Sequence, residues 1–324
     1  MTSHDIIGHS DTLGFLQSAM ESGKLTHAYL LAGPVGVGKT AVARWLVGSV
    51  LGTESLESHP DFAFVERGEN AKTGKLQNAI VIEQIHGLRG RIALGPMMGG
   101  WKTAILSGAD RMNDAAANAL LKTLEEPGPR TLIVLTAETA EAVLPTVRSR
   151  CQVIRLVRVP RTEIVEGLVR RGIDRTKADL AARLSGGCPG RSITLSADRA
   201  VLDELVERRD RLMDITESRL SERWPGLERE IPEKVSFNEA RDAMEETLGL
   251  LSELLRDAVW IGQGLEDRMV HVDRRDRLAA WTERFGLKRL VTALEETDSG
   301  RRQLAANVSP KTVAGLVAIS LSGL

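Results

Sequence analysis

The stretch Gly33-Pro34-Val35-Gly36-Val37-Gly38-Lys39-Thr40 matches the phosphate-loop pattern G-x-x-x-x-G-K-[ST] at every fixed position. The largely apolar residues 27–32 before it have the pattern of a buried strand, and residues 39–51 have the spacing of an amphipathic helix. Strand, glycine loop and helix therefore occur in the order that a P-loop requires. This context predicts an α/β domain with a phosphate-binding loop.

The loop residues have distinct expected roles. The glycines Gly33, Gly36 and Gly38 allow successive backbone N–H groups to curl around phosphate oxygens, and the N-terminus of the following helix adds positive potential. Lys39 is expected to reach the outer phosphates and Thr40 the metal ion. Two alternatives stay open: a glycine-rich turn with no ligand, and a loop that persists without bound nucleotide.

The strand that should supply a magnesium-holding acid lacks it. Residues 102–107 have a strand pattern, but the two positions where a P-loop ATPase carries its aspartate and glutamate are Ser107 and Gly108. Asp110 lies three residues beyond Ser107, about 10 Å along an extended chain, whereas direct magnesium coordination needs roughly 2.1 Å. We interpret Asp110 as a solvated or helix-capping acid. The chain is therefore expected to bind ATP or ADP with weakly held Mg²⁺ and to hydrolyse it slowly or not at all.

Composition sets the outer limits. The 324 residues suggest two domains or three small ones, 42% hydrophobic residues suffice for real cores, and no apolar run approaches the roughly 20 residues of a membrane span. Residues 1–5 show no signal-peptide pattern, so a cytoplasmic protein is expected. A net charge of -1 and 3% aromatic residues predict that any DNA contact is weak or shared with partners. The chain has only two cysteines, Cys151 and Cys188, so a four-cysteine zinc site is excluded.

The first half of the chain alternates predicted strands and helices. Helices are expected at 11–21, 39–51, 80–88 and 113–126, and strands at 27–32, 62–65, 102–107 and 131–136. Repeated β-α units of this kind favour a parallel sheet covered by helices on both faces. Beyond about residue 160 the strand signals fade, and the remainder is predicted to be helical, with turns near Pro225, Pro232 and Gly262.

Two longer motifs carry a family resemblance. They are Asp114-Ala115-Ala116-Ala117-Asn118-Ala119-Leu120-Leu121-Lys122-Thr123-Leu124-Glu125-Glu126-Pro127 and Thr146-Val147-Arg148-Ser149-Arg150-Cys151. Together with the loop, they resemble the bacterial clamp-loader branch of the AAA+ ATPases, over essentially the whole chain. The resemblance implies an AAA+ P-loop parallel-sheet domain at 1–159, a small helical lid at 160–199 and an all-α collar, or oligomerisation, domain at 200–324.

Within that branch the chain resembles the delta-prime type of DNA polymerase III subunit more than the ATP-hydrolysing gamma/tau type. The acidic pair is missing, and the zinc-binding cysteines expected of gamma/tau are absent between Leu51 and Trp101. No long tail follows Leu324. Delta-prime relatives often have a degraded phosphate loop, and this chain departs from that pattern because its loop is complete.

The resemblance also implies roles for three side chains. Arg150 matches the arginine finger, which enters the ATP site of a neighbouring subunit and neutralises charge on the γ-phosphoryl oxygens, an effect of about 10³ to 10⁵ in rate. Thr136 matches the polar residue called sensor 1, and Arg191 matches the sensor 2 arginine. Their plain alternatives are a surface arginine, a strand-terminal threonine and a solvated helix-start arginine. For Glu125 and Glu126, at a helix C-terminus, we expect structural or intersubunit salt bridges.

These observations predict a largely static clamp-loader subunit of the replicative DNA polymerase III holoenzyme. Its expected partners are gamma/tau and delta subunits, the sliding clamp, and primer-template DNA reached through the assembled complex. The nucleotidyltransferase activity would belong to the holoenzyme, because no polymerase carboxylate constellation is recognisable here. The alternatives are a gamma/tau-like motor, an autonomous P-loop ATPase or kinase, and a scaffold with an empty loop.

Overall fold

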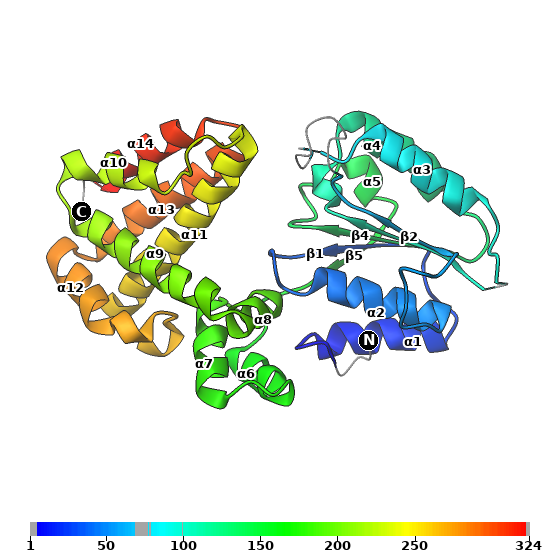
Figure 1. Cartoon of the computed structure of the whole chain (residues 1–324), viewed down its shortest axis with the longest axis horizontal. Helices are drawn as coiled ribbons and strands as arrows, with labels where there is room; N and C mark the ends of the chain where they lie inside the picture. Colours follow the sequence, from blue (N-terminus) through cyan, green and yellow to red (C-terminus); the bar gives the residue numbers. More distant parts are fainter. Residues whose placement is uncertain (1–4, 69–76, 78, 99, 322–324) are drawn as a thin grey trace. The chain divides into compact units, whose positions relative to one another are not determined.

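The computed structural model describes residues 5–68, 77, 79–98 and 100–321, so residues 1–4 of the N-terminal stretch considered above lie outside it. The chain divides into two compact units, Met1–Ala197 and Asp198–Leu324 (Figure 1). The predicted boundary between the P-loop domain and the lid, near residue 159, lies inside the first unit and stays a prediction.

The first unit contains a five-stranded parallel sheet in the order β2-β3-β4-β1-β5. The strands are β1 (Ala28–Ala32), β2 (Phe62–Val65), β3 (Lys102–Ser107), β4 (Thr131–Ala137) and β5 (Gln152–Arg155). In a parallel sheet all carboxyl ends meet at one edge, here called the carboxyl edge, and all amino ends at the opposite amino edge. The α/β class predicted from the alternating pattern is confirmed.

Helices cover both faces of this sheet (Figure 1). Helices α1 (Ser10–Glu21) and α2 (Lys39–Leu51) share an apolar core with Tyr29 and Leu31 of β1. Helices α3 (Ile82–Ala93), α4 (Asp114–Glu125) and α5 (Pro145–Arg148) cover the other face, where Ala28 and Leu30 of the same strand point. Side chains of a strand alternate between faces, so a strand buried on both sides is apolar throughout.

Three further helices complete the first unit: α6 (Arg161–Arg170), α7 (Arg175–Leu184) and α8 (Pro189–Ala197). The helix predicted at 80–88 begins at Ile82 instead, because Ile80 forms an isolated parallel bridge with Met112. The helix continues to Ala93. The predicted N-cap of α4 is confirmed, since the Asn113 side chain accepts a hydrogen bond from the Ala116 N–H. Strand β5 is only four residues long and was not predicted.

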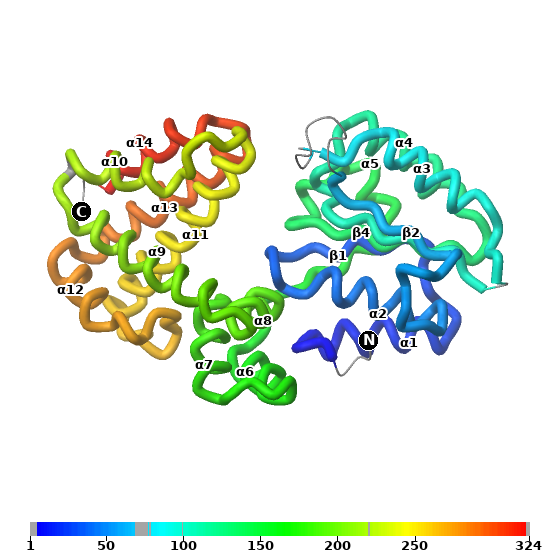
Figure 2. Tube along the Cα trace, viewed as in Figure 1, coloured from blue at the N-terminus to red at the C-terminus, as the bar shows by residue number. Residues whose placement is uncertain are grey.

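The second unit is helical, and Figure 2 follows its trace from α9 to α14. Helix α11 carries much of its core, with Leu248, Leu251 and Leu255 fully buried. Its elements are α9 (Arg199–Glu217), α10 (Leu220–Arg229), α11 (Phe237–Gly262), the 3-10 turns η3 (Glu266–Arg268) and η4 (Val272–Arg274), α12 (Arg275–Phe285), α13 (Leu287–Ala305) and α14 (Pro310–Ser320). Within the ranges described, no helix is both long and apolar enough to cross a bilayer.

The turn predicted at Pro225 is wrong. Pro225 lies inside α10, where it has no N–H to donate to the carbonyl of Ser221. Packing outweighs this loss, because α10 lies against α9 and α14 and buries Leu227 completely. The turns expected near Pro232 and Gly262 do separate helices.

Candidate functional site

The phosphate loop leaves the carboxyl end of β1, between β4 and β5. The Gly33 N–H donates to the carbonyl of Ala137 at 3.2 Å, which ties the start of the loop to the end of β4. A side chain on Gly33 would collide with the Leu156 carbonyl, and Gly36 has a φ of 77°. Glycine is required at the first position by the close approach and favoured at the second by the left-handed backbone.

Helix α2 begins directly at the end of the loop and presents an open N-terminus. Its N-cap is Gly38, with a φ of 114°, and within the described residues of its first turn there is neither a side-chain cap nor an acid. Thr40 is exposed in that turn. Unpaired N–H groups and the helix dipole favour an anion at such a terminus, so these residues fit a phosphate group.

Lys39 folds back over its own loop. Its ammonium donates to the carbonyl oxygens of Gly33 at 2.6 Å and Pro34 at 2.9 Å. Burial lowers the pKa of Lys39, while the nearby carboxylates of Glu138 and Asp110 partly raise it. To reach a phosphate, the ammonium must exchange two carbonyl partners for phosphate oxygens.

The start of α8 packs on the same loop and brings Arg191 to it. The Gly190 N–H donates to the Gly36 carbonyl at 2.7 Å, and a Cβ on Gly36 would lie 3.3 Å from the Arg191 backbone nitrogen. His9 also contacts the loop, since its Nε2 lies 2.8 Å from the Val37 carbonyl. Arg191 was predicted only through the family motif. No pattern in the sequence identifies His9 as a residue that contacts the loop.

Thr136 lies beside the position of the missing acid. Ser107 of β3 is paired with Thr136 of β4, and the Gly108 N–H donates to the Thr136 hydroxyl at 3.1 Å. Thr136 is buried, so its hydroxyl contributes to the structure of this edge. The residues predicted for nucleotide binding thus gather around the carboxyl edge: Gly33, Gly36, Gly38, Lys39, Thr40, Thr136 and Arg191. Their nucleotide-binding roles stay predictions.

The interpretation of Asp110 as a solvated or capping acid is wrong. Asp110 lies within the 3-10 turn η2 (Ala109–Arg111), and its side chain is only 9% exposed. Burial raises the pKa of Asp110, an effect that Glu138 reinforces and Arg111 opposes. Within this tight turn after β3 the carboxyl group is mostly buried and lies close enough to Lys39 to influence its pKa.

Arg150 lies at the opposite, amino edge of the sheet. It precedes β5, whose first residue Gln152 is paired with Tyr29 near the start of β1, and β5 alone spans about 13 Å. Its guanidinium forms a 2.5 Å ion pair with Glu125 and donates to the Thr146 carbonyl at 2.8 Å. The Arg150 side chain is 34% exposed. The structure therefore separates Arg150 from the phosphate loop of its own chain.

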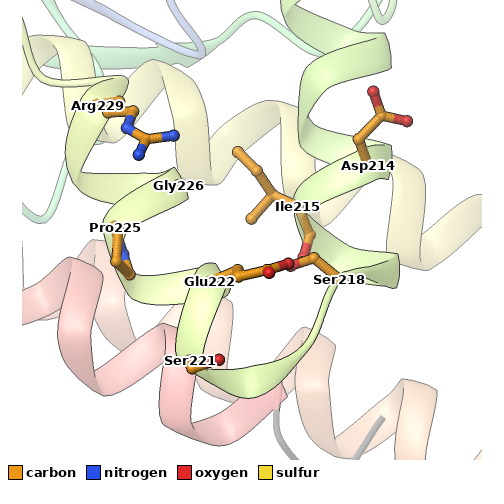
Figure 3. Close-up of a pocket in the computed structure, with 8 residues that line it drawn as sticks. All are labelled: Asp214, Ile215, Ser218, Ser221, Glu222, Pro225, Gly226 and Arg229. Atoms are coloured by element: carbon orange, nitrogen blue, oxygen red, sulfur yellow. The ribbon is translucent and has the colours of Figure 1, made fainter.

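A hollow in the second unit lies between the end of α9 and α10 and has a volume of about 440 Å³ (Figure 3). It is lined by Asp214, Ile215, Ser218, Ser221, Glu222, Pro225, Gly226 and Arg229. None of the residues predicted for nucleotide binding lines it. It offers no support for a nucleotide site in this unit.

Two family models and a relative that aligns over most of its length match the chain. The model described as "DNA polymerase III, delta subunit" matches residues 8–160, and the model described as "DNA polymerase III, delta subunit, C terminal" matches residues 229–311. A delta-prime subunit of DNA polymerase III from Bacillus subtilis strain 168 is 28% identical over 265 residues, which cover 80% of this chain and 79% of that protein. The chain belongs to the delta-prime family of DNA polymerase III subunits.

Other relatives fit this delta-prime membership. The delta-prime subunit of Escherichia coli K12 is 31% identical over 199 residues, covering 56% of this chain and 57% of that protein. A gamma/tau subunit of Mycobacterium tuberculosis H37Rv is 30% identical over 222 residues, but these cover only 36% of the gamma/tau protein. The chain is a DNA polymerase III subunit of the delta-prime type, as its motifs predicted.

Proposed function

We propose that this chain is a largely static member of the clamp-loader ring that lends Arg150 to the ATP of a neighbouring gamma/tau-type subunit. ATP hydrolysis in the neighbour would then depend on assembly of the ring. That hydrolysis would set the time at which the sliding clamp is loaded onto primed DNA. Arg150, at the amino edge, is well placed for a partner and poorly placed for its own loop. This separation is the observation that carries the proposal.

The chemistry of the two edges supports the same division. At the carboxyl edge, the loop and the start of α2 offer N–H groups to a triphosphate, but Ser107 and Gly108 provide no carboxylate for magnesium or for the attacking water. Lys39, Thr40 and Arg191 are the residues that would contact a bound nucleotide. Such a nucleotide would persist without turnover, and the whole chain's own ATPase would be slow or absent.

Assembly needs a surface on the helical unit, and α10 and α14 offer one. Trp224 is 53% exposed and lies against Gly315, while Leu316 and Ile319 on α14 are 48% and 63% exposed. Large apolar side chains that gather on a surface favour a protein partner. These residues support the collar role that we propose for residues 200–324, with gamma/tau and delta subunits as neighbours.

The test is a reconstituted clamp loader that carries Arg150→Ala in this subunit. We expect normal assembly and a loss of about 10³-fold or more in DNA-stimulated ATPase, because a guanidinium that neutralises γ-phosphoryl charge is missing. Unchanged turnover in a fully assembled complex would exclude the arginine-finger role.

A further inference from the structure

We infer that Glu125 is a positioning residue that holds Arg150 in a docked conformation on its own subunit until a neighbour's triphosphate competes for the guanidinium. The inference rests on the proposed function and adds a regulator to it. Its starting point is the 2.5 Å ion pair between the Arg150 guanidinium and the Glu125 carboxylate.

In this docked conformation Arg150 bonds to its own chain. One terminal nitrogen donates to the Thr146 carbonyl at 2.8 Å and lies 3.4 Å from the Ser149 hydroxyl, and the other pairs with Glu125. Among the contacts described, Glu125 is the one that carries a charge. A guanidinium held in this way has part of its charge neutralised and some of its donors engaged, which weakens its attraction for a phosphate.

The backbone on both sides of the pair is anchored. Leu124, next to Glu125, is 2% exposed, and the Glu126 N–H donates to the Lys122 carbonyl at 3.1 Å to close α4. On the other side Val147 of α5 is fully buried, and α5 packs against α4. The carboxylate and the guanidinium therefore meet because two fixed elements bring them together.

Helix stability does not explain a glutamate at this position. Glu125 is the last residue of α4, where the helix dipole disfavours a negative charge. Pairing with Arg150 compensates for that unfavourable position. Glu125 therefore does not stabilise its own helix, but it does form an ion pair with Arg150.

The ion pair between Glu125 and Arg150 is expected to be weak enough for a triphosphate to displace it. The two side chains are 34% and 47% exposed, and pairs of such exposure shift an equilibrium by at most about fivefold. A triphosphate carries several negative charges and accepts the planar fork of an arginine, so it displaces Glu125 once the ring is closed. Before that, Glu125 reduces the fraction of subunits whose finger is available.

The experiment compares Glu125→Gln with wild type in the reconstituted complex, with Glu126→Gln as the matched neighbour control. We expect Glu125→Gln to raise the DNA-independent ATPase or lower its KM for ATP by about two- to fivefold. The DNA-stimulated kcat should stay within error of wild type, because the finger is then already engaged. Glu126→Gln should match wild type in both.

Two further variants separate the possible failures. In an Arg150→Ala background, Glu125→Gln should have no effect, because the restraint acts only through the guanidinium. If Arg150→Ala alone leaves turnover unchanged, the finger role fails. If Arg150→Ala abolishes turnover but Glu125→Gln lowers the stimulated kcat or changes nothing, the finger stands and the restraint is wrong. Thermal unfolding of Glu125→Gln that differs from Glu126→Gln would indicate a structural role and also overturn the restraint.

Discussion

Two cations of the first unit, Lys39 and Arg150, lie at opposite edges of one sheet and are held in opposite ways. Lys39 is half-buried, bonded to neutral carbonyls of its own loop, and has a pKa lowered by burial. Arg150 is a third exposed and paired with a carboxylate at the surface. The difference supports the proposal that Lys39 serves a site inside the chain and that Arg150 is available to a partner.

After the loss expected for Arg150→Ala, the next largest change should come from altering the shape of the cation at this position. Arg150→Lys keeps the positive charge but replaces a planar fork with a compact ammonium on a flexible stem. In the reconstituted complex we expect it to lose about 10²-fold or more of the DNA-stimulated ATPase. Turnover close to wild type would mean that charge alone suffices at this position.

The amino edge that displays Arg150 has its own buried ion pair. Asp61 pairs with Lys102 at 2.9 Å and accepts the Met97 and Met98 N–H groups. Burial would raise its pKa, but these partners lower the pKa of Asp61 to about 2. This stabilisation is present above the unfolded value of 3.8 and is lost as pH falls toward 2.

Asp61→Asn tests whether this edge depends on that pair. It leaves the buried Lys102 ammonium without its counter-ion, so we expect the free energy of unfolding of the first unit to fall by about 3 kcal/mol near neutral pH. Denaturant unfolding of the full chain, followed by hydrogen exchange in β2 and β3, measures the loss. A difference from wild type that persists unchanged at pH 2 would contradict the ionic explanation.

The second unit contains a similar carboxylate without a lysine. Asp257 is fully buried and accepts the Val270 and His271 N–H groups, and burial raises its pKa to about 6. Because the folded value exceeds the unfolded 3.8, its favourable contribution is present below about pH 4 and is lost as pH rises through 6.

Asp257→Asn should therefore stabilise the second unit near neutral pH, whereas Asp61→Asn should destabilise the first. Both N–H groups reach Oδ2, so an amide oxygen at that position keeps both bonds without a charge. We expect the variant to be more stable than wild type at pH 7.5, by up to about 3 kcal/mol, and equal at pH 4. Hydrogen exchange in α11 of the full chain measures this, and lower stability at pH 7.5 would refute the assignment.

The smallest expected effect is on nucleotide binding by the isolated chain. Lys39→Ala removes the ammonium but leaves the N–H groups of the loop and of α2, so we expect ATP affinity to fall by about tenfold. Titration of labelled ATP with and without Mg²⁺ measures it. Negligible binding to both wild type and variant would mean that the loop is retained without nucleotide.

Much of this could be predicted from the sequence. The loop, the missing acids and the alternating β-α pattern are local signals, and they predicted the sheet and the loop residues at its carboxyl edge. Thr136 and Arg191 were predicted only through the family resemblance. Strand β5, the His9 contact and the pairing of Glu125 with Arg150 depend on segments distant in sequence. Asp110 was misjudged because an extended chain was assumed where the structure has a 3-10 turn.

We propose that this subunit contributes Arg150 to catalysis in a neighbour and that its own loop is not a catalytic site. The most direct measurement is DNA-stimulated ATPase of two reconstituted complexes, one with Arg150→Ala and one with Lys39→Ala in this subunit. We expect a loss of about 10³-fold or more for Arg150→Ala and wild-type turnover for Lys39→Ala. The reverse pattern, with turnover dependent on Lys39 and independent of Arg150, would contradict it.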